Sequence, residues 1–575
     1  MPELSARFPP GLVLGGLLSA GERSLSSWGN IYHFSLPASA GGFIVRPLGD
    51  SYNRLGRAEI LLYNWQKMST ASSFFRKLRA IFPWERFAVV VILFLGFVLR
   101  LRQYFTGRSL WLDEAMLALN IVNRDLAGLF RPLDYDQGSP IGFLLVEKFF
   151  YLLFGDHEFI LRFFPFVAGI AALGLFYFLL QRTTSRFGLL TGLALFAFSP
   201  ELIYYSSEVK QYSLDVAVAI GLLLLADPLL DGRIEKRGFF YLGLAGIFGL
   251  WFSHPALFVS TGIGIGLLIR SIVQRRRSQI GLVLKLGGIW LVNLGLLYFV
   301  SLRGLSQNQF LVDYWQENFV PIPPWSDWSW FKAVFEDIVQ IQVGVQISSW
   351  LALIILILGL VFLSSKNKAF GGVLSFIFIF ALIASALRLY PLGGRLSLFL
   401  VPLVILLISL SIDTLEHRFP TQFKWSTFVA LFVGAYLLYS PISESFNNYS
   451  NPKYFEHIRP SMQVLAEHWR QGDSLFVSNG ALPAFRFYAD RYGLDNVSYQ
   501  TSQASDYSEP EKILRHLEVL DGKSRVWVLI THVYETEDFN EKDFLLSSLD
   551  AMGEHKREFR SPGTSVYLNL YDLSH

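Results

Sequence analysis

Two adjacent carboxylates, Asp113 and Glu114, lie just beyond the first strongly apolar segment of the chain. The apolar residues around them, Trp111 among them, predict an amphipathic helix that packs against other apolar surface. Ionisable groups in such a place are costly to keep unless they carry protons, ions or substrate. We therefore expect burial to raise the pKa of Asp113 towards the range of a general base, with Glu114 supporting it or positioning a polar group.

Other acids follow in the same loop, and a simpler interpretation competes for them. For three of these acids, the favoured explanation is that they are loop carboxylates exposed to water: Asp125, Asp156 and Glu158. Asp136, taken together with Asp113 and Glu114, offers the oxygen ligands that a hard divalent cation prefers. No ligand spacing demands a metal, so a divalent cation is an open option and no cofactor is assigned.

A second group of polar residues comes at the turn between two later apolar segments. Glu208, Tyr212 and Asp215 are spaced i, i+4 and i+7, so they share one face of a helix, and Lys210 adds a positive charge. A polar stripe that enters a membrane normally faces a water-filled cavity, which makes Glu208, Tyr212 and Lys210 candidates for substrate binding. The alternative is that the tyrosines belong to an interfacial aromatic belt.

A third group is a tight glycine-rich turn that contains Arg388, Tyr390 and Arg395. The charge pattern of the whole chain assigns this turn to the external side of the membrane. Basic residues are disfavoured on that side, so the arginines need a partner. A phosphate at headgroup depth is the natural one, because Arg offers paired donors to its oxygens. Snorkelling to lipid headgroups is the alternative. His254, in another external turn, either adds a donor or lies at the membrane interface.

Composition identifies the class of protein that must position these residues. Of 575 residues, 52% are hydrophobic and only 17% are charged, whereas soluble domains carry about 25% charged residues. The chain has no cysteine, which excludes disulfides, thiolate metal sites and cysteine nucleophiles. Eleven segments are apolar and long enough to span a bilayer: 87–103, 160–180, 187–204, 212–230, 238–253, 255–270, 280–302, 349–364, 370–388, 396–412 and 425–441.

The basic residues between these segments predict the topology. Arg and Lys cluster in the short connections after every second segment, including Arg275, Arg276 and Arg277, and such connections are cytoplasmic. The long loops 104–159 and 303–348 and the tail from 442 then lie outside the cytoplasm. This requires the short apolar run Ile141–Phe154 to be an interfacial or re-entrant helix.

The chain divides into three predicted parts. Residues 1–67 lack helical or strand periodicity and are expected to be disordered, or a spurious extension from an upstream start codon. Residues 68–441 form an all-α polytopic membrane domain. Residues 442–575 are expected to form a small extracytoplasmic α/β domain for scaffolding or acceptor recognition. Its predicted elements are strands at 473–478, 524–530 and 567–571 and helices at 461–469 and 541–552.

Several of these features together resemble the membrane glycosyltransferases of the GT-C class. They are the Asp-Glu pair in a long first external loop, the interfacial helix, Arg162-Phe-Phe-Pro165, the Ser199-Pro200 to Tyr212 turn, and the late Tyr390-Pro391 to Arg395 turn. The chain looks most like the branch with protein O-mannosyltransferases, the lipid A aminoarabinose transferase and rhizobial core-galacturonosyl transferases. The resemblance covers about residues 80–440, and some members carry a soluble tail.

The resemblance implies a sugar donor linked to polyprenyl or dolichyl phosphate, and inversion at the anomeric carbon. It implies that Asp113 deprotonates a hydroxyl acceptor on a protein, lipid or polysaccharide. Arg395, Arg388 and Lys210 would then stabilise the lipid-phosphate leaving group. The chain departs from the family pattern at Gly138-Ser139-Pro140, where many members have His-Pro-Pro or Lys-Pro, and at Lys210, where many have Arg.

The sequence thus predicts a hexosyl- or pentosyl-type glycosyltransferase in the plasma membrane, with its active site outside the cytoplasm and no nucleic-acid partner. A transporter or flippase of lipid-linked saccharides is the main alternative, but no inverted repeat is apparent. A non-catalytic protein of envelope-polysaccharide assembly is the third. The aromatic run that contains Trp315, in loop 303–348, either stacks on sugar rings or anchors the loop at the interface.

Overall fold

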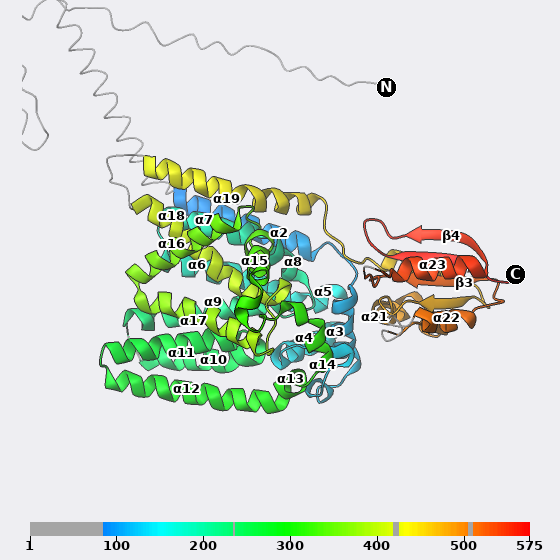
Figure 1. Ribbon diagram of the computed structural model, residues 1–575, viewed down its shortest axis with the longest axis horizontal. Helices are drawn as coiled ribbons and strands as arrows, with labels where there is room; N and C mark the ends of the chain where they lie inside the picture. The colour runs from blue at the N-terminus through cyan, green and yellow to red at the C-terminus, as the bar shows by residue number, and fades with distance from the viewer. Residues whose placement is uncertain (1–83, 234–235, 418–424, 504–509, 537, 575) are drawn as a thin grey trace, which may run out of the picture. The chain divides into compact units, whose positions relative to one another are not determined.

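The computed structural model describes residues 84–233, 236–417, 425–503, 510–536 and 538–574. The predicted extension 1–67 lies outside these residues. Each of the eleven predicted apolar segments coincides with a helix (Figure 1). The helices are α2 (Trp84–Tyr104), α6 (Phe163–Thr183), α7 (Arg186–Phe198), α9 (Tyr212–Asp231), α10 (Lys236–Phe252), α11 (Ala256–Val273), α12 (Arg277–Leu297), α16 (Ser349–Lys366), α17 (Lys368–Ala386), α18 (Val401–His417) and α19 (Trp425–Ser450).

Length and composition mark most of these helices as membrane spans. Among the described residues, 8 helices are long and apolar enough to cross a bilayer. The number is 9 if α7 and the segment Pro200–Ser207, bent by 55°, form one span. The predicted segments at α2 and α10 are the two outside this set, so a count of eleven crossings stays a prediction. The protein is an all-α polytopic membrane protein with a small C-terminal sheet domain.

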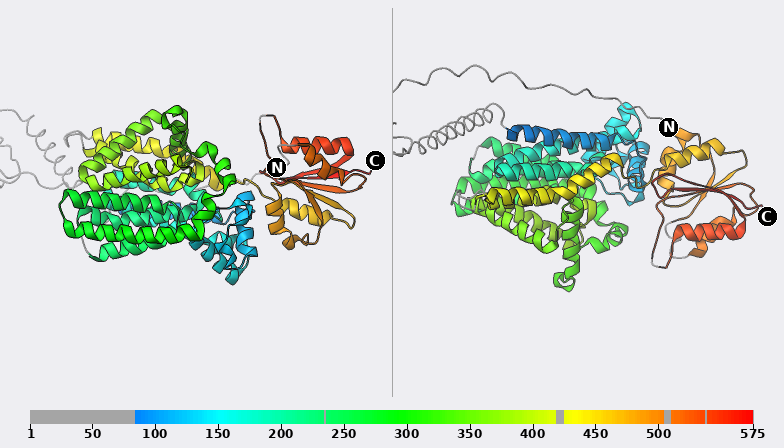
Figure 2. Two further views of the ribbon diagram at one scale, coloured as in Figure 1. Left: turned by 60° about the horizontal axis from the view of Figure 1, so that its bottom comes forward. Right: turned by 90° about the horizontal axis from the view of Figure 1, so that it is seen from above.

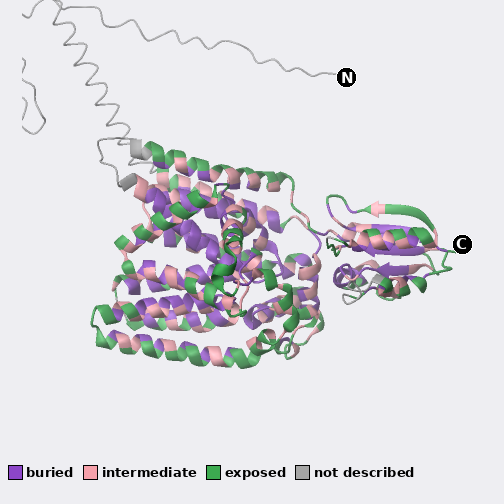
Figure 3. Cartoon of the chain, in the orientation of Figure 1, coloured by how far each residue is buried: buried purple, intermediate pink, exposed green. Residues whose placement is uncertain are grey.

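Burial separates inner from outer helices of the bundle. Helix α18 lies inside, and every residue from 401 to 413 is buried. Helices α12, α16 and α19 instead expose large apolar side chains such as Val292, Trp350 and Phe432, as expected for helices that face lipid (Figure 3). Arg100 of α2 is buried against α7, and its guanidinium donates to the backbone oxygens of Gly96, Phe196 and Ala197.

The loop 104–159, predicted to be external, contains three short helices. They are α3 (Leu112–Asn123), α4 (Ile141–Phe154) and α5 (Glu158–Leu161). The prediction of a separate 14-residue helix at Ile141–Phe154 is confirmed. Lys148 of α4 donates to the backbone oxygens of Ile121 and Val122, two of the last carbonyls of α3. This contact satisfies carbonyls that have no partner within the helix and fixes α3 against α4.

The C-terminal domain contains a five-stranded sheet with helices on both faces (Figure 2). Its order is β2-β1-β3-β5-β4, in which β2, β1 and β3 are parallel and β5 and β4 antiparallel. The strands are β1 (Ser474–Val477), β2 (Tyr499–Thr501), β3 (Val526–Ile530), β4 (Glu554–Arg560) and β5 (Tyr567–Asp572). The helices are α20 (Arg459–His468), α21 (Leu482–Tyr488), α22 (Pro510–Glu518) and α23 (Glu541–Met552).

Alternating side chains of the strands build two separate cores. Leu475 and Val477 of β1 point to the face covered by α20 and α21, whereas Phe476 between them points to the face of α22 and α23. The first core continues into α3 and α4, so the domain packs on the first external loop. The predicted boundary at 442 falls inside α19, because that helix continues to Ser450 beyond the end of its apolar run.

Candidate functional site

Asp113, in the first turn of α3, pairs with two cations from distant parts of the chain. Its Oδ1 accepts from Lys210 Nζ at 2.8 Å, and its Oδ2 lies 2.6 Å from Arg395 Nη2. The side chains are 15%, 4% and 17% exposed, so this is a largely buried ion triplet. Lys210 also donates to Gln137 Oε1 at 2.6 Å. The three predicted groups of polar residues therefore meet at one place.

The charge balance corrects the expectation for the pKa of Asp113. Burial raises its pKa, as the apolar neighbours predicted, but Lys210 and Arg395 outweigh burial and lower the pKa to about 2. Asp113 is thus a firmly ionised carboxylate in this arrangement. Burial lowers the pKa of Lys210, although the charge of Asp113 opposes that shift. Sequence reasoning counted the local apolar residues and had no means of counting cations from distant turns.

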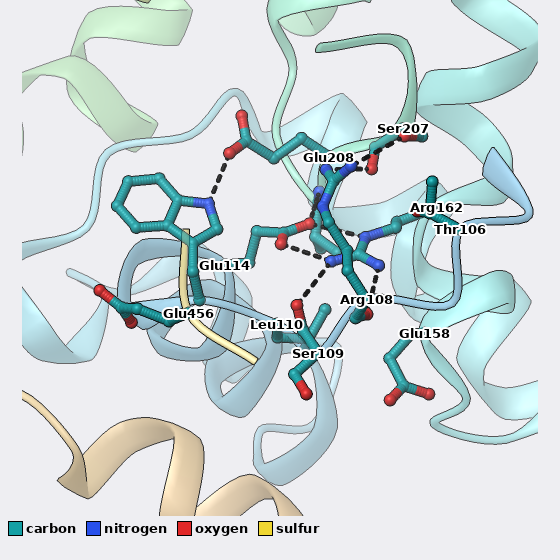
Figure 4. Close-up of polar contacts among 12 residues, drawn as sticks. Thr106, Arg108, Ser109, Leu110, Glu114, Glu158, Arg162, Ser207, Glu208 and Glu456 are labelled. Atoms are coloured by element: carbon teal, nitrogen blue, oxygen red, sulfur yellow. Dashed lines mark hydrogen bonds and ion pairs between the residues drawn. The ribbon is translucent and has the colours of Figure 1, made fainter. Parts of the chain in front are cut away.

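Glu114 has different partners from its neighbour. It is fully buried and accepts from Arg162 Nε at 2.8 Å and Nη2 at 2.5 Å, and from the backbone N–H of Val209 at 2.9 Å (Figure 4). Arg162 in turn donates to the backbone oxygens of Arg108 and Ser109. This bidentate pair ties the start of α3 to α6 and to the turn before α9. Glu114 therefore positions the segment that carries Asp113.

Glu208 adds a buried acid beside the triplet. Its Oε1 accepts from the indole N–H of Trp111 at 2.5 Å, whereas its Oε2 has no hydrogen-bond partner in the part of the chain that the structure describes. Burial, followed by the charge of Glu114, raises the pKa of Glu208 to about 7, against the opposing effect of Arg395 and Arg108. Burial thus favours the protonated form of Glu208, which limits the negative charge of the site.

Aromatic rings surround the guanidinium of Arg395. The guanidinium carbon lies 5.2 Å from the ring centre of Trp111 and 5.8 Å from those of Tyr212 and Trp315. Arg395 Nε is buried and has no hydrogen-bond partner among the described residues. A donor therefore remains unpaired beside aromatic rings, which suits a ligand with an anionic group and a sugar ring.

The turn before Arg395 is held from several sides. Asp337 Oδ2 accepts from Gly394 N at 2.9 Å, and Gln342 Nε2 donates to Gly394 O at 2.8 Å. A Cβ on Gly393 would lie 2.1 Å from the side-chain nitrogen of Asn318, so a larger residue here would displace the Asn318 amide. Tyr390 donates its hydroxyl to the backbone oxygen of Leu396 at 2.8 Å. Tyr390 therefore supports the turn and does not contact the ion triplet.

Three predicted site residues lie apart from the triplet. Arg388 is exposed, and its side chain makes no ion pair or hydrogen bond with the described residues. Asp136 is exposed and accepts from Asn308 Nδ2 at 2.7 Å. Burial lowers the pKa of His254 to about 4, and its Nε2 is buried without a partner in the described ranges.

The described residues do not form a ligand set for a divalent cation. Within the described residues, no group of three or more His, Asp or Glu side chains is arranged to hold a metal ion. Asp113, Glu114 and Asp136 each bond to a separate set of partners. The three carboxylates that could have bound a metal together are therefore not brought together.

Sequence reasoning missed residues that reach the site from the C-terminal domain and its linker. Glu456 Oε2 accepts from the backbone N–H of Leu112, the first residue of α3, at 3.0 Å. Its other oxygen lies 2.7 Å from Nδ1 of His532. A lone acid and a lone histidine in a soluble domain carry no recognisable spacing, so only the fold could place them beside α3.

Comparisons with known proteins find similar structures but no similar sequence. No protein-family model matches the chain, and no curated protein matches it. The chain is similar to the crystal structure of ArnT from Cupriavidus metallidurans bound to undecaprenyl phosphate, with a TM-score of 0.49 and 14% identity over 85% of this chain and 98% of that one. The apo state of ArnT gives a TM-score of 0.49 and 13% identity, with the same coverage.

An archaeal protein gives a similar result. The Archaeoglobus fulgidus oligosaccharyltransferase AglB, in complex with an inhibitory peptide and a dolichol-phosphate, has a TM-score of 0.47 and 11% identity over 86% of this chain and 74% of that one. At these low identities and TM-scores, the function has to be argued from the site itself.

Proposed function

We propose that the chain is a glycosyltransferase that moves a hexosyl- or pentosyl-type sugar from a polyprenyl-phosphate carrier to a hydroxyl acceptor, on the extracytoplasmic side of the plasma membrane and with inversion. The observation that carries the proposal is the ion triplet of Asp113, Lys210 and Arg395, with aromatic rings around Arg395. The positive-inside rule supports the external side.

The charges of the triplet favour a phosphate ligand. Lys210 and Arg395 bring two positive charges against one negative charge of Asp113, and the raised pKa of Glu208 adds less than a full negative charge at neutral pH. A lipid-linked phosphodiester would balance this excess. Arg395 still has an open Nε donor, and arginine binds phosphate oxygens through paired N–H groups.

Inverting transfer then follows from these groups. The acceptor oxygen attacks the anomeric carbon from the side opposite the phosphate and loses its proton, while the bond from the anomeric carbon to the phosphate oxygen breaks. The lipid phosphate leaves with the bonding electrons, and Lys210 and Arg395 stabilise its charge. The proton passes to Asp113. Indole faces at Trp111 and Trp315 suit the C–H faces of the transferred sugar.

Asp113 becomes a competent base only after the donor binds. In the free site its two cations hold the pKa at about 2. A donor phosphate draws Lys210 and Arg395 towards its own oxygens and leaves burial as the dominant influence on the carboxyl group, which raises the pKa. Donor binding therefore activates the base, and the proposal includes an ordered reaction in which the donor binds before the acceptor.

The test is a transfer assay with a matched pair of arginine variants. Purified protein in detergent is given a panel of polyprenyl-phosphate sugars and hydroxyl acceptors, and products are detected by mass spectrometry. Wild type should form a new glycosidic bond, and Arg395→Gln should lose at least about 100-fold in turnover, as expected when a charge stabiliser of the transition state is removed. Arg388→Gln, an exposed arginine of the same turn, is the control and should retain activity.

Two outcomes would overturn the proposal. A wild-type protein that carries lipid-linked sugars across a vesicle membrane without making a glycosidic bond would be a transporter. Equal activity of the Arg395→Gln and Arg388→Gln variants would show that the triplet does not bind the reacting phosphate.

A further inference from the structure

The connections of the C-terminal sheet diverge at one of its edges. The chain leaves β1 through α21 to reach β2 on one flank, and it returns through α22 to β3 on the other flank of β1. Open α/β sheets bind ligands outside the carboxyl ends of strands whose connections diverge in this way. Here that edge is formed by the residues after β1, Ser478–Gly480, and after β3, Thr531 and His532, of which His532 is exposed.

The backbone at this edge is constrained. A Cβ on Gly480 would lie 2.5 Å from Thr531 O and 2.7 Å from His532 O, so the two strand ends approach closely only because residue 480 is glycine. His532 has a φ of 50°, in the left-handed region that residues other than glycine rarely adopt. Strain of this kind persists where the surrounding structure enforces it, often at functional sites. A histidine at a position better suited to glycine indicates that the imidazole ring has a functional role.

The ring of His532 is held by one nitrogen. Nδ1 lies 2.7 Å from Glu456 Oε1, and the Glu456 side chain is almost fully buried, at 5% exposure. The carboxylate fixes a proton on Nδ1, which leaves the lone pair of Nε2 as a hydrogen-bond acceptor. The His532 side chain is 46% exposed, so that nitrogen is accessible. A carboxylate that orients one nitrogen so that the other can act on a hydroxyl is a recurrent arrangement in enzymes.

The same ring lies beside the ion triplet. The ring centres of His532 and Trp111 are 6.4 Å apart, and Trp111 lies against Arg395. Glu456 bonds both to His532 and to the first backbone N–H of α3, the helix that carries Asp113. Two buried hydroxyls at this edge, those of Ser478 and Thr531, have no hydrogen-bond partner among the residues that the structure describes. Glu456 and His532 therefore link this edge of the sheet to the helix that carries Asp113.

We propose that the exposed surface around His532, at the carboxyl ends of β1 and β3, is the acceptor subsite, and that His532 Nε2 accepts a hydrogen bond from a saccharide hydroxyl and holds the acceptor against Asp113. This inference rests on the proposed glycosyl transfer and deepens it. A saccharide fits better than an apolar lipid alcohol, because this surface belongs to the C-terminal sheet domain and offers the polar ring of His532. The acceptor thus arrives from the water side, and the donor from the lipid side.

A pH dependence follows from the groups that face His532. Burial lowers the pKa of His532, but the hydrogen bond and charge of Glu456 outweigh burial, with smaller contributions from Asp113 and Glu541, so that the pKa is raised above its usual value. Only the neutral ring accepts a hydrogen bond at Nε2. The KM for the acceptor should therefore rise as the pH falls through this raised pKa, whereas the KM for the donor should not follow that titration.

The experiment measures both KM values of the full-length protein against pH with a saccharide acceptor. His532→Ala should raise the acceptor KM about 10-fold or more, the cost of one lost hydrogen bond to a charged or strongly polar partner, and should remove the acidic rise in acceptor KM. Glu456→Gln should shift that rise to lower pH, because the carboxylate no longer raises the histidine pKa. His468→Gln, an exposed histidine whose ring lies 3.0 Å from Val464 O of its own helix, is the control and should behave as wild type.

The outcomes separate this inference from the proposed function. If wild type transfers the sugar but His532→Ala leaves the acceptor KM and its pH profile unchanged, the acceptor subsite alone is overturned. A change in donor KM equal to that in acceptor KM would show a general structural defect and would also overturn it. Absence of transfer by wild type with every donor would overturn both proposals.

Discussion

Replacement of Glu114 by Gln should destabilise the protein strongly, because the change leaves a buried arginine unpaired. The Arg162 and Glu114 side chains are 2% and 0% exposed, and the carboxylate accepts three hydrogen bonds at 2.8, 2.5 and 2.9 Å. Removing one partner of a buried ion pair costs about 3–5 kcal/mol, mostly because the remaining charge stays desolvated. Glutamine keeps the shape and one acceptor oxygen but removes the negative charge.

A thermal unfolding assay in detergent tests this prediction with a matched control. Glu114→Gln should lower the unfolding midpoint by several degrees, by about 5 °C or more. Asp134→Asn breaks an ion pair of similar length, between Arg124 and an Asp134 side chain that is 67% exposed. An exposed pair contributes at most about 1 kcal/mol, so this control should unfold close to wild type.

The comparison also decides the role of Glu114. If Glu114→Gln unfolds at the same temperature as Asp134→Asn but loses turnover, Glu114 acts in the chemistry and the positioning role assigned here is wrong. If both stability and activity fall, the variant Glu114→Asp separates the two, since it keeps the charge at a shorter reach. Recovery of stability in Glu114→Asp would confirm that the charge of the buried pair is what matters.

Further predictions concern the triplet and its support. Asp113→Asn should bind the donor lipid phosphate about 10-fold more tightly while turnover falls, because Lys210 and Arg395 lose their competing carboxylate; weaker binding, measured by calorimetry, would contradict the displacement of Asp113 by phosphate. Titration of Asp113 should not change the donor affinity of wild type between about pH 5 and 8, because a group with a pKa of about 2 stays ionised throughout this range. Lys210→Gln should raise the pKa of Asp113 by removing one of the two charges that lower it, which carboxyl titration by NMR would detect. Tyr390→Phe should cost about 1 kcal/mol, the net value of its hydrogen bond to Leu396 O, so its unfolding midpoint should fall by less than that of Glu114→Gln.

Much of the fold could be predicted because its signals are local. Long apolar runs predict helices wherever a bilayer or a buried core excludes water, and each of the eleven runs is a helix. The helix Ile141–Phe154 was predicted with the bounds that the structure has, because its apolar run is too short for a span. The strands β2 and β4 were missed, since one is three residues long and the other is mostly exposed and charged.

The site could be predicted only in part, and Asp113 shows why. Its apolar neighbours correctly indicated burial, but the sign of its pKa shift depends on two cations that approach from other turns of the chain. Arg388 and Arg395 have similar sequence surroundings, yet one is exposed and the other pairs with Asp113. Electrostatic interactions depend on distance in space, and residue spacing along the chain does not determine that distance.

The sequence by itself determined the class of the protein, the positions of its helices and the residue types from which a phosphate-binding site can be built, because hydrophobicity and periodicity act over a few neighbouring residues. Only the tertiary structure decided which charges meet: Asp113 with Lys210 and Arg395, Glu114 with Arg162, and Glu456 with both His532 and the start of α3. These contacts result from packing between helices and domains. They determine whether a buried carboxylate is protonated, pairs with a cation or stabilises the fold.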